Sequence, residues 1–160
     1  DVTHLSDECL WQALELYRGP VWASHHNARA LVPHQRQLAD DMFRALVARD
    51  AVVCVCLDGW MMTPGWERGK TTSTSAGLTL ARLADHIDHW CQRAGNARHV
   101  GIGSDLDGAF GTEQTPSDLA SIADLSRLPA ILRGRGYTDA DIAGLMGGNL
   151  RRFLASALPR

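Results

Sequence analysis

The sequence predicts an α/β domain built around a parallel sheet. Short apolar runs alternate along the chain with segments of helical periodicity, and this alternation is typical of β–α units. The run over 51–57 is apolar at nearly every position, as in strands that are buried on both faces. No long linker interrupts the 160 residues, a length that suits one domain with a substantial core.

The first third of the chain predicts a helix, a strand, a loop and a second helix. Ser6 is placed to cap the first helix, whose apolar residues recur at three-to-four spacing until Gly19 ends it. A short buried strand over 20–24 follows, and then a polar loop over 25–38. The second helix begins at Asp40, where an acidic side chain favours the helix N-terminus.

The remaining chain continues the alternation. The strand over 51–57 precedes a loop over 58–75, and loops of this length are usually functional or mobile. A strongly amphipathic helix is predicted over 75–94, with Gly95 as its stop signal, and a third strand over 99–103 comes next. The pattern after that strand predicts helical segments over 117–135, 138–147 and 149–158.

Composition excludes several classes of protein. No stretch approaches the roughly 18 apolar residues of a membrane-spanning helix, and mean hydropathy is −0.16. A formal net charge of −2 removes the general electrostatic basis for binding nucleic acid or an anionic membrane. The four cysteines form no CxxC pair and the first residues do not resemble a signal peptide, so we expect reduced thiols and a cytoplasmic protein.

Polar side chains occur where the predicted strands end, which is where ligands bind in parallel sheets and barrels. His4 and His25 each follow a strand-like segment, and Asp105 and Asp107 follow the strand over 99–103. Imidazole and carboxylate groups are ligands that Zn²⁺ prefers. The residues alone leave a second interpretation open, in which the histidines are hydrogen-bonded loop residues and the aspartates build an Asp-Gly turn.

Other chemistry-bearing residues are weaker candidates. We expect His86 and His89 to lie on the solvent-facing side of the predicted helix over 75–94. Four further side chains have either a site role or a purely structural one: His26, His34, Trp60 and Trp66.

The segment SHHNARALVPHQR, from Ser24 to Arg36, resembles the membrane dipeptidase (renal dipeptidase) family of zinc peptidases. The resemblance continues in the same order through nearly the whole chain. It includes the histidine segment over 1–8, the motif GIGSDLDG over 101–108, and the closing helices over 135–153.

The resemblance implies roles for individual residues. His4 and His25 are implied to be ligands of one zinc of a binuclear pair. Arg36 is implied to bind the C-terminal carboxylate of the substrate or the tetrahedral oxyanion, a task for which its planar fork of donors is suited. Asp105 is implied to receive the free amino group of a dipeptide or to assist proton transfer.

The resemblance also implies that residues 1–160 form the carboxy-terminal half of a (β/α)₈ barrel. Family members are longer than this chain, and their remaining site residues lie in an amino-terminal half: a His-x-Asp pair, a bridging carboxylate and a further histidine. A half-barrel needs a complement for its open sheet edges. We expect the amino-terminal half of the same polypeptide to fill that place, and self-association into a homo-oligomer is the alternative.

The function implied by the resemblance is zinc-dependent hydrolysis of dipeptides by a metal-bridging hydroxide. Two alternatives remain open at this point. One is a catalytically incomplete half-barrel that acts as an assembly module. The other is an amidohydrolase that acts on another small amide or a lactam.

Overall fold

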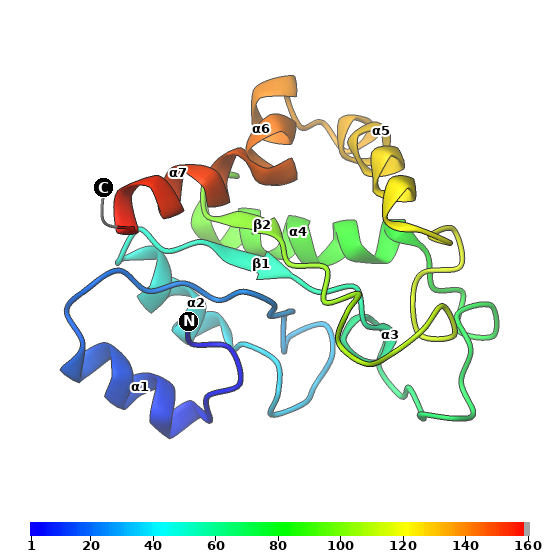
Figure 1. The fold of residues 1–160 in the computed structure, drawn as a ribbon, viewed down its shortest axis with the longest axis horizontal. Coiled ribbons are helices and arrows are strands. Elements are labelled where there is room, and N and C mark those ends of the chain that lie inside the picture. The colour runs from blue at the N-terminus through cyan, green and yellow to red at the C-terminus, as the bar shows by residue number, and fades with distance from the viewer. Residues whose placement is uncertain (159–160) are drawn as a thin grey trace.

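The computed structural model describes residues 1–158 and places a two-stranded parallel sheet at the centre of the fold. Strand β1 (Val53–Val55) pairs with β2 (Val100–Ile102), with Val53 opposite Val100. Figure 1 shows helix α4 (Leu80–Ala94) lying along these strands. The predicted α/β class is confirmed in this part of the chain.

Extended segments continue the sheet on the β1 side. Ala23 makes a single parallel bridge with Val53. Beyond it, the N–H of Val2 donates to the carbonyl oxygen of Trp22 at 2.9 Å. The predicted strand over 20–24 is therefore reduced to one bridged residue in extended chain. Segments that are adjacent along the chain are also adjacent in the sheet, as successive β–α units require.

Helices lie on both sides of the strands in Figure 1. Two lie near the N-terminus: α1 (Asp7–Leu16) and α2 (Asp40–Val47). Three lie on the other side: α5 (Leu128–Gly134), α6 (Asp139–Ala143) and α7 (Asn149–Ala157). Shorter helical turns are α3 (Gly59–Met62), the 3₁₀ turn η1 (Ile122–Arg127) and the π turn η2 (Gly144–Gly148). Within residues 1–158, no helix is both long and apolar enough to cross a membrane.

Several helix ends follow local signals in the sequence. The Cys9 N–H donates to the Ser6 hydroxyl at 3.3 Å, so Ser6 caps α1 as predicted. Thr138 and Asp141 form a reciprocal capping box at the start of α6. Gly95 ends α4 with φ of 71°, a left-handed conformation that glycine adopts without steric cost.

Other boundaries differ from the prediction. Helix α4 begins at Leu80 and not at residue 75, because the Leu80 N–H donates to the Asp118 carboxylate at 2.8 Å, a partner far away in sequence. The predicted loop over 58–75 contains α3. The helix predicted over 117–135 is divided between η1 and α5.

The expectation that His86 and His89 face solvent is wrong. His86 is fully buried, and its Nδ1 accepts the Ala28 N–H at 3.1 Å. His89 is 9% exposed, and its Nε2 lies 2.7 Å from Asp40 Oδ1. Helix α4 contacts both the sheet and α2, so the face that we expected to be solvated is covered by other elements.

Strand β1 separates two apolar clusters. Val53 and Val55 belong to the main core with the surrounding helices, whereas Cys54 packs in a smaller cluster with Phe153. This alternation is the period of two that a strand imposes. Cys54 and Cys56 are buried free thiols, and burial raises the pKa of each to about 12, so both are protonated at neutral pH.

Candidate metal and substrate site

The two predicted zinc ligands meet at the carboxyl ends of their strand-like segments. The Nε2 atoms of His4 and His25 are 3.0 Å apart, and the rings meet edge to face with centroids separated by 4.9 Å. Burial lowers the pKa of both rings, and the Arg36 charge lowers both further against the opposing effect of the Asp105 carboxylate. A lowered pKa favours the neutral imidazole, which is the protonation state of a metal ligand.

Two hydroxyl groups orient the ring of His25. Its Nδ1 lies 2.9 Å from the Ser24 hydroxyl, which in turn donates to the Thr3 hydroxyl at 3.2 Å. The backbone N–H of His25 also donates to the Thr3 hydroxyl, at 3.3 Å. Because Nδ1 is engaged in this way, Nε2 is the nitrogen left to face His4. This is the arrangement in which surrounding groups orient a ligand and select its tautomer.

The side chain of Asp105, which follows β2, also lies beside His25. Its Oδ2 lies 4.0 Å from His25 Nε2. The two strand ends come this close because residue 103 is glycine: a Cβ atom at Gly103 would overlap the carbonyl oxygen of Ser24. Asp107 lies in a turn and is exposed, as the Asp-Gly turn interpretation expects.

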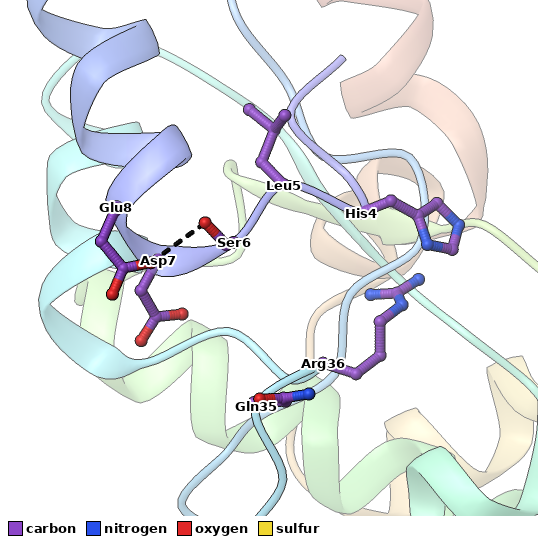
Figure 2. A pocket seen from close by; sticks show the side chains of 7 residues that line it. All are labelled: His4, Leu5, Ser6, Asp7, Glu8, Gln35 and Arg36. Atoms are coloured by element: carbon purple, nitrogen blue, oxygen red, sulfur yellow. Dashed lines mark hydrogen bonds between the residues drawn. The ribbon is translucent and has the colours of Figure 1, made fainter.

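Arg36 supplies a positive charge beside the histidines. Figure 2 shows its guanidinium extending toward the His4 ring. Its Nη2 donates to the backbone carbonyl of His25 at 3.2 Å, while the buried Nη1 has no hydrogen-bond partner among the described residues. The pocket that Arg36 lines together with Gln35 and residues 4–8 has a volume of about 350 Å³. An unpaired donor of this kind is suited to a carboxylate or an oxyanion.

These donors fit part of a zinc coordination shell. His4 and His25 offer neutral nitrogens aimed at one point, and the Asp105 carboxylate is near. Across residues 1–158, no group of three or more His, Cys, Asp or Glu side chains is arranged to hold a metal ion by itself. Catalytic zinc sites use about three protein ligands. The chemistry of His4, His25 and Asp105 thus fits some of the ligand positions of such a site but does not complete it.

Asp58, which was expected at the start of a loop, is a buried acidic residue near Cys56. It is 4% exposed and directly follows the apolar run over 51–57. Its N–H donates to the Cys56 thiol at 3.4 Å, and that sulfur lies 3.8 Å from Asp105 Oδ2. The signal that singled out His25 and Asp105, a polar residue after an apolar run, applies equally to Asp58.

Four side chains were expected to have either a site role or a structural role: His26, His34, Trp60 and Trp66. Trp66 packs against the main core and His26 is 3% exposed, so both contribute to the folded structure. Trp60 and His34 contact each other edge to face, with ring centroids 5.0 Å apart.

The sequence profile of the membrane dipeptidases, peptidase family M19, matches residues 1–158. The chain belongs to the M19 family. This M19 chain is 32% identical over 154 residues to dipeptidase aclJ of Aspergillus oryzae, a match that covers 96% of this chain and 34% of that protein. It is 31% identical over 154 residues to an uncharacterised protein in the pqqA 5′ region of Klebsiella pneumoniae, covering 96% of this chain and 53% of that protein.

Solved structures of similar proteins agree with this assignment. A metallopeptidase from Rhodobacter sphaeroides, liganded with a phosphinate mimic of the dipeptide L-Ala-D-Ala, is 25% identical with a TM-score of 0.79. That match covers 99% of this M19 chain and 42% of the solved chain. The probable dipeptidase PvdM from Pseudomonas aeruginosa is 26% identical with a TM-score of 0.78, covering 96% and 48%. The M19 chain therefore spans at most about half the length of these relatives, as a partial α/β domain.

Proposed function

We propose that residues 1–160 form the carboxy-terminal half of a (β/α)₈-barrel zinc dipeptidase. The observation that carries the proposal is the approach of His4 Nε2 to His25 Nε2, 3.0 Å apart, beside the unpaired Nη1 of Arg36. In this proposal the two histidines are ligands of one zinc of a binuclear centre. An amino-terminal half of the same barrel supplies the remaining ligands. The similarity to a dipeptidase of A. oryzae and to the metallopeptidase of R. sphaeroides supports this assignment.

Each residue of the site has a task that its chemistry supports. Bound zinc supplies a nucleophilic water at neutral pH and polarises the peptide carbonyl. Ser24 holds the His25 ring so that Nε2 stays available. Arg36 binds the C-terminal carboxylate of the dipeptide or the oxyanion of the transition state. Asp105 either accepts hydrogen bonds from the free amino group of the dipeptide or assists proton transfer during hydrolysis.

Replacement of His25 tests the proposal. In the protein expressed at its natural length, His25→Ala should lower the zinc content measured by elemental analysis and abolish hydrolysis of dipeptides such as Ala-Ala. Glu15→Ala, a change at an exposed residue of α1, serves as the control and should retain both properties. Full activity of the wild type in zinc-free buffer after chelation would contradict the proposal.

The same experiment separates the alternatives. A folded protein without stoichiometric zinc and without hydrolysis favours the assembly module. If the protein binds zinc and hydrolyses a lactam or another small amide but no dipeptide, the proposed metal site is correct and the proposed substrate class is wrong.

A further inference from the structure

Asp58 places a buried carboxylate close to the proposed substrate site. The residue is 4% exposed, and its Oδ1 has no hydrogen-bond partner within the described part of the chain. Asp58 precedes α3, and hydrogen bonding from the ring and backbone N–H groups of Trp60 in that helix lowers the pKa of its carboxyl group. These contacts leave Oδ1 without a partner, so the start of the helix accounts for only part of the environment of this carboxylate. A buried acceptor atom without a partner destabilises the fold, so it calls for a functional explanation.

Contacts and charges connect this carboxylate with the site. The Cys56 thiol lies 3.4 Å from the backbone nitrogen of Asp58 and 3.8 Å from Asp105 Oδ2, and the charge of the Asp58 carboxylate raises the pKa of Arg36. Burial raises the pKa of Asp58, and the charge of Asp105 raises it further, whereas Trp60 and Arg68 lower it. A cation beside Asp58 would consequently stabilise the ionised carboxylate.

The chain itself presents a cation to Asp58. Arg68 Nη2 lies 3.6 Å from Asp58 Oδ2, and the Arg68 guanidinium carbon lies 5.3 Å from the centre of the Trp60 ring. The Arg68 side chain is 67% exposed, whereas that of Asp58 is only 6% exposed. At 3.6 Å this contact is longer than a strong charge-assisted hydrogen bond. The exposed Arg68 side chain can therefore be displaced when another cation takes its place beside the buried Asp58 carboxylate.

We propose that Asp58 and Trp60 form a subsite for the cationic side chain of a dipeptide substrate, which Arg68 occupies when no substrate is bound. A carboxylate combined with an aromatic face is suited to guanidinium and ammonium groups. Arg68 makes both kinds of contact within the chain, one with the Asp58 carboxylate and one with the Trp60 ring. The inference rests on the proposed function and extends it to a substrate class: dipeptides that contain arginine or lysine.

Two substitutions with opposite expected effects test the subsite. In the zinc-loaded protein at its natural length, kcat/KM is measured for Ala-Ala and for dipeptides with arginine at the first or second position. Asp58→Asn should lower the ratio of cationic to neutral kcat/KM by about tenfold or more, because a charge-assisted contact is lost. Arg68→Met should lower KM for the arginine dipeptides several-fold, because an intramolecular competitor is removed.

The matched control is Asp139→Asn, which removes a carboxylate that is 83% exposed and pairs with Arg133 at 2.7 Å. It should leave the selectivity ratio at the wild-type value. An equal decrease of kcat/KM for all dipeptides in Asp58→Asn would assign a structural role to Asp58 and overturn the subsite. Unaltered KM values in Arg68→Met would overturn the role of Arg68.

A binding measurement separates this inference from the proposed function. The probe is n-butylguanidinium, which carries the cation without an amide bond, and its binding is followed by calorimetry. Binding to the wild type that is lost in Asp58→Asn supports the subsite even if no dipeptide is hydrolysed, in which case the proposed function alone fails. Dipeptide hydrolysis without Asp58-dependent binding of the probe overturns the subsite alone.

Discussion

His4 and Asp105 share an unusual backbone conformation. Their φ values are 71° and 56°, in the left-handed region that side chains other than glycine rarely adopt. Each residue lies where a strand-like segment gives way to a loop, and its conformation turns the side chain toward the common point near His25. Aspartate and histidine tolerate this region better than most residues, so the strain is small, of the order of 1 kcal/mol.

Polar residues after apolar runs identified His4, His25 and Asp105 as candidates, and the family resemblance added Arg36. The structure brings these four side chains together. Their roles as ligands and substrate contacts remain predictions. Asp58 was missed although its local signal was present, because the position after one apolar run was read only as the start of a loop. The absence of a hydrogen-bond partner for its Oδ1 atom in the described structure is visible only when the distant groups around it are placed.

Buried His86 makes stability depend on pH. Burial lowers its pKa from 6.5 to about 4. The unfolded chain therefore takes up a proton before the folded chain does, so the free energy of unfolding is highest above pH 6.5 and falls as pH decreases toward 4. The contribution of His86 to this loss is about 3 kcal/mol between pH 7 and pH 4.

Urea unfolding of the wild type and His86→Asn over this pH range measures that contribution. An asparagine oxygen can still accept the Ala28 N–H, yet it does not titrate. The variant should therefore lose less stability on acidification than the wild type does. Parallel curves for the two proteins would show that His86 does not titrate as described.

At the scale of elements, the site depends on how closely β2 approaches the segment that carries His25. The Gly103 N–H donates to the Val55 carbonyl at 2.9 Å, which continues the register of β1 and β2 beyond the last paired residues. The absence of a side chain at Gly103 then lets the chain pass against Ser24. Strand register and one glycine together set the distance between Asp105 and His25.

Gly103→Ala should destabilise the protein by about 1–3 kcal/mol, because the new methyl group has no room and the backbone must shift. It should also weaken zinc binding, since the shift moves Asp105 away from His25. The control is Gly134→Ala at the end of α5, where a Cβ meets no atom within 4 Å and stability should be unchanged or slightly higher. Thermal unfolding and zinc titration test both variants, and equal behaviour of the two would refute the steric argument.

Element boundaries were predictable where the signal is local. Helices α1 and α6 begin after the capping side chains of Ser6 and Thr138. Helix α4 ends at Gly95, whose backbone adopts the left-handed conformation that glycine favours. The start of α4 was not predictable in this way, because its first N–H is satisfied by Asp118, a residue from a separate loop.

At the scale of the molecule, one edge of the sheet has no strand partner within the described residues. Over residues 1–158, β2 pairs only with β1, and the chain spans 42% of the length of the R. sphaeroides structure that it resembles. A barrel completed by a further segment of polypeptide would cover that edge and bring more ligands to the histidines. The site and the architecture thus point to the same complement.

Removal of the metal tests whether the folded protein binds zinc. At natural length, zinc present at 100 times its dissociation constant should add about 2.7 kcal/mol to the free energy of unfolding, because the metal binds only the folded state. Chelation should therefore lower the melting temperature, and His25→Ala should make it insensitive to the chelator. A melting temperature that chelation leaves unaltered in the wild type would refute zinc binding in this fold.

Local sequence patterns determine many features of this protein. Strand–helix alternation predicts the α/β class, capping residues predict helix ends, and polar residues after apolar runs predict the rim that carries the site. These features depend on neighbours within a few residues. Tertiary structure alone decided that His86 and His89 are buried and that Asp58 keeps an unpaired oxygen within the described chain. Such properties depend on groups tens of residues apart, whose proximity no local pattern records.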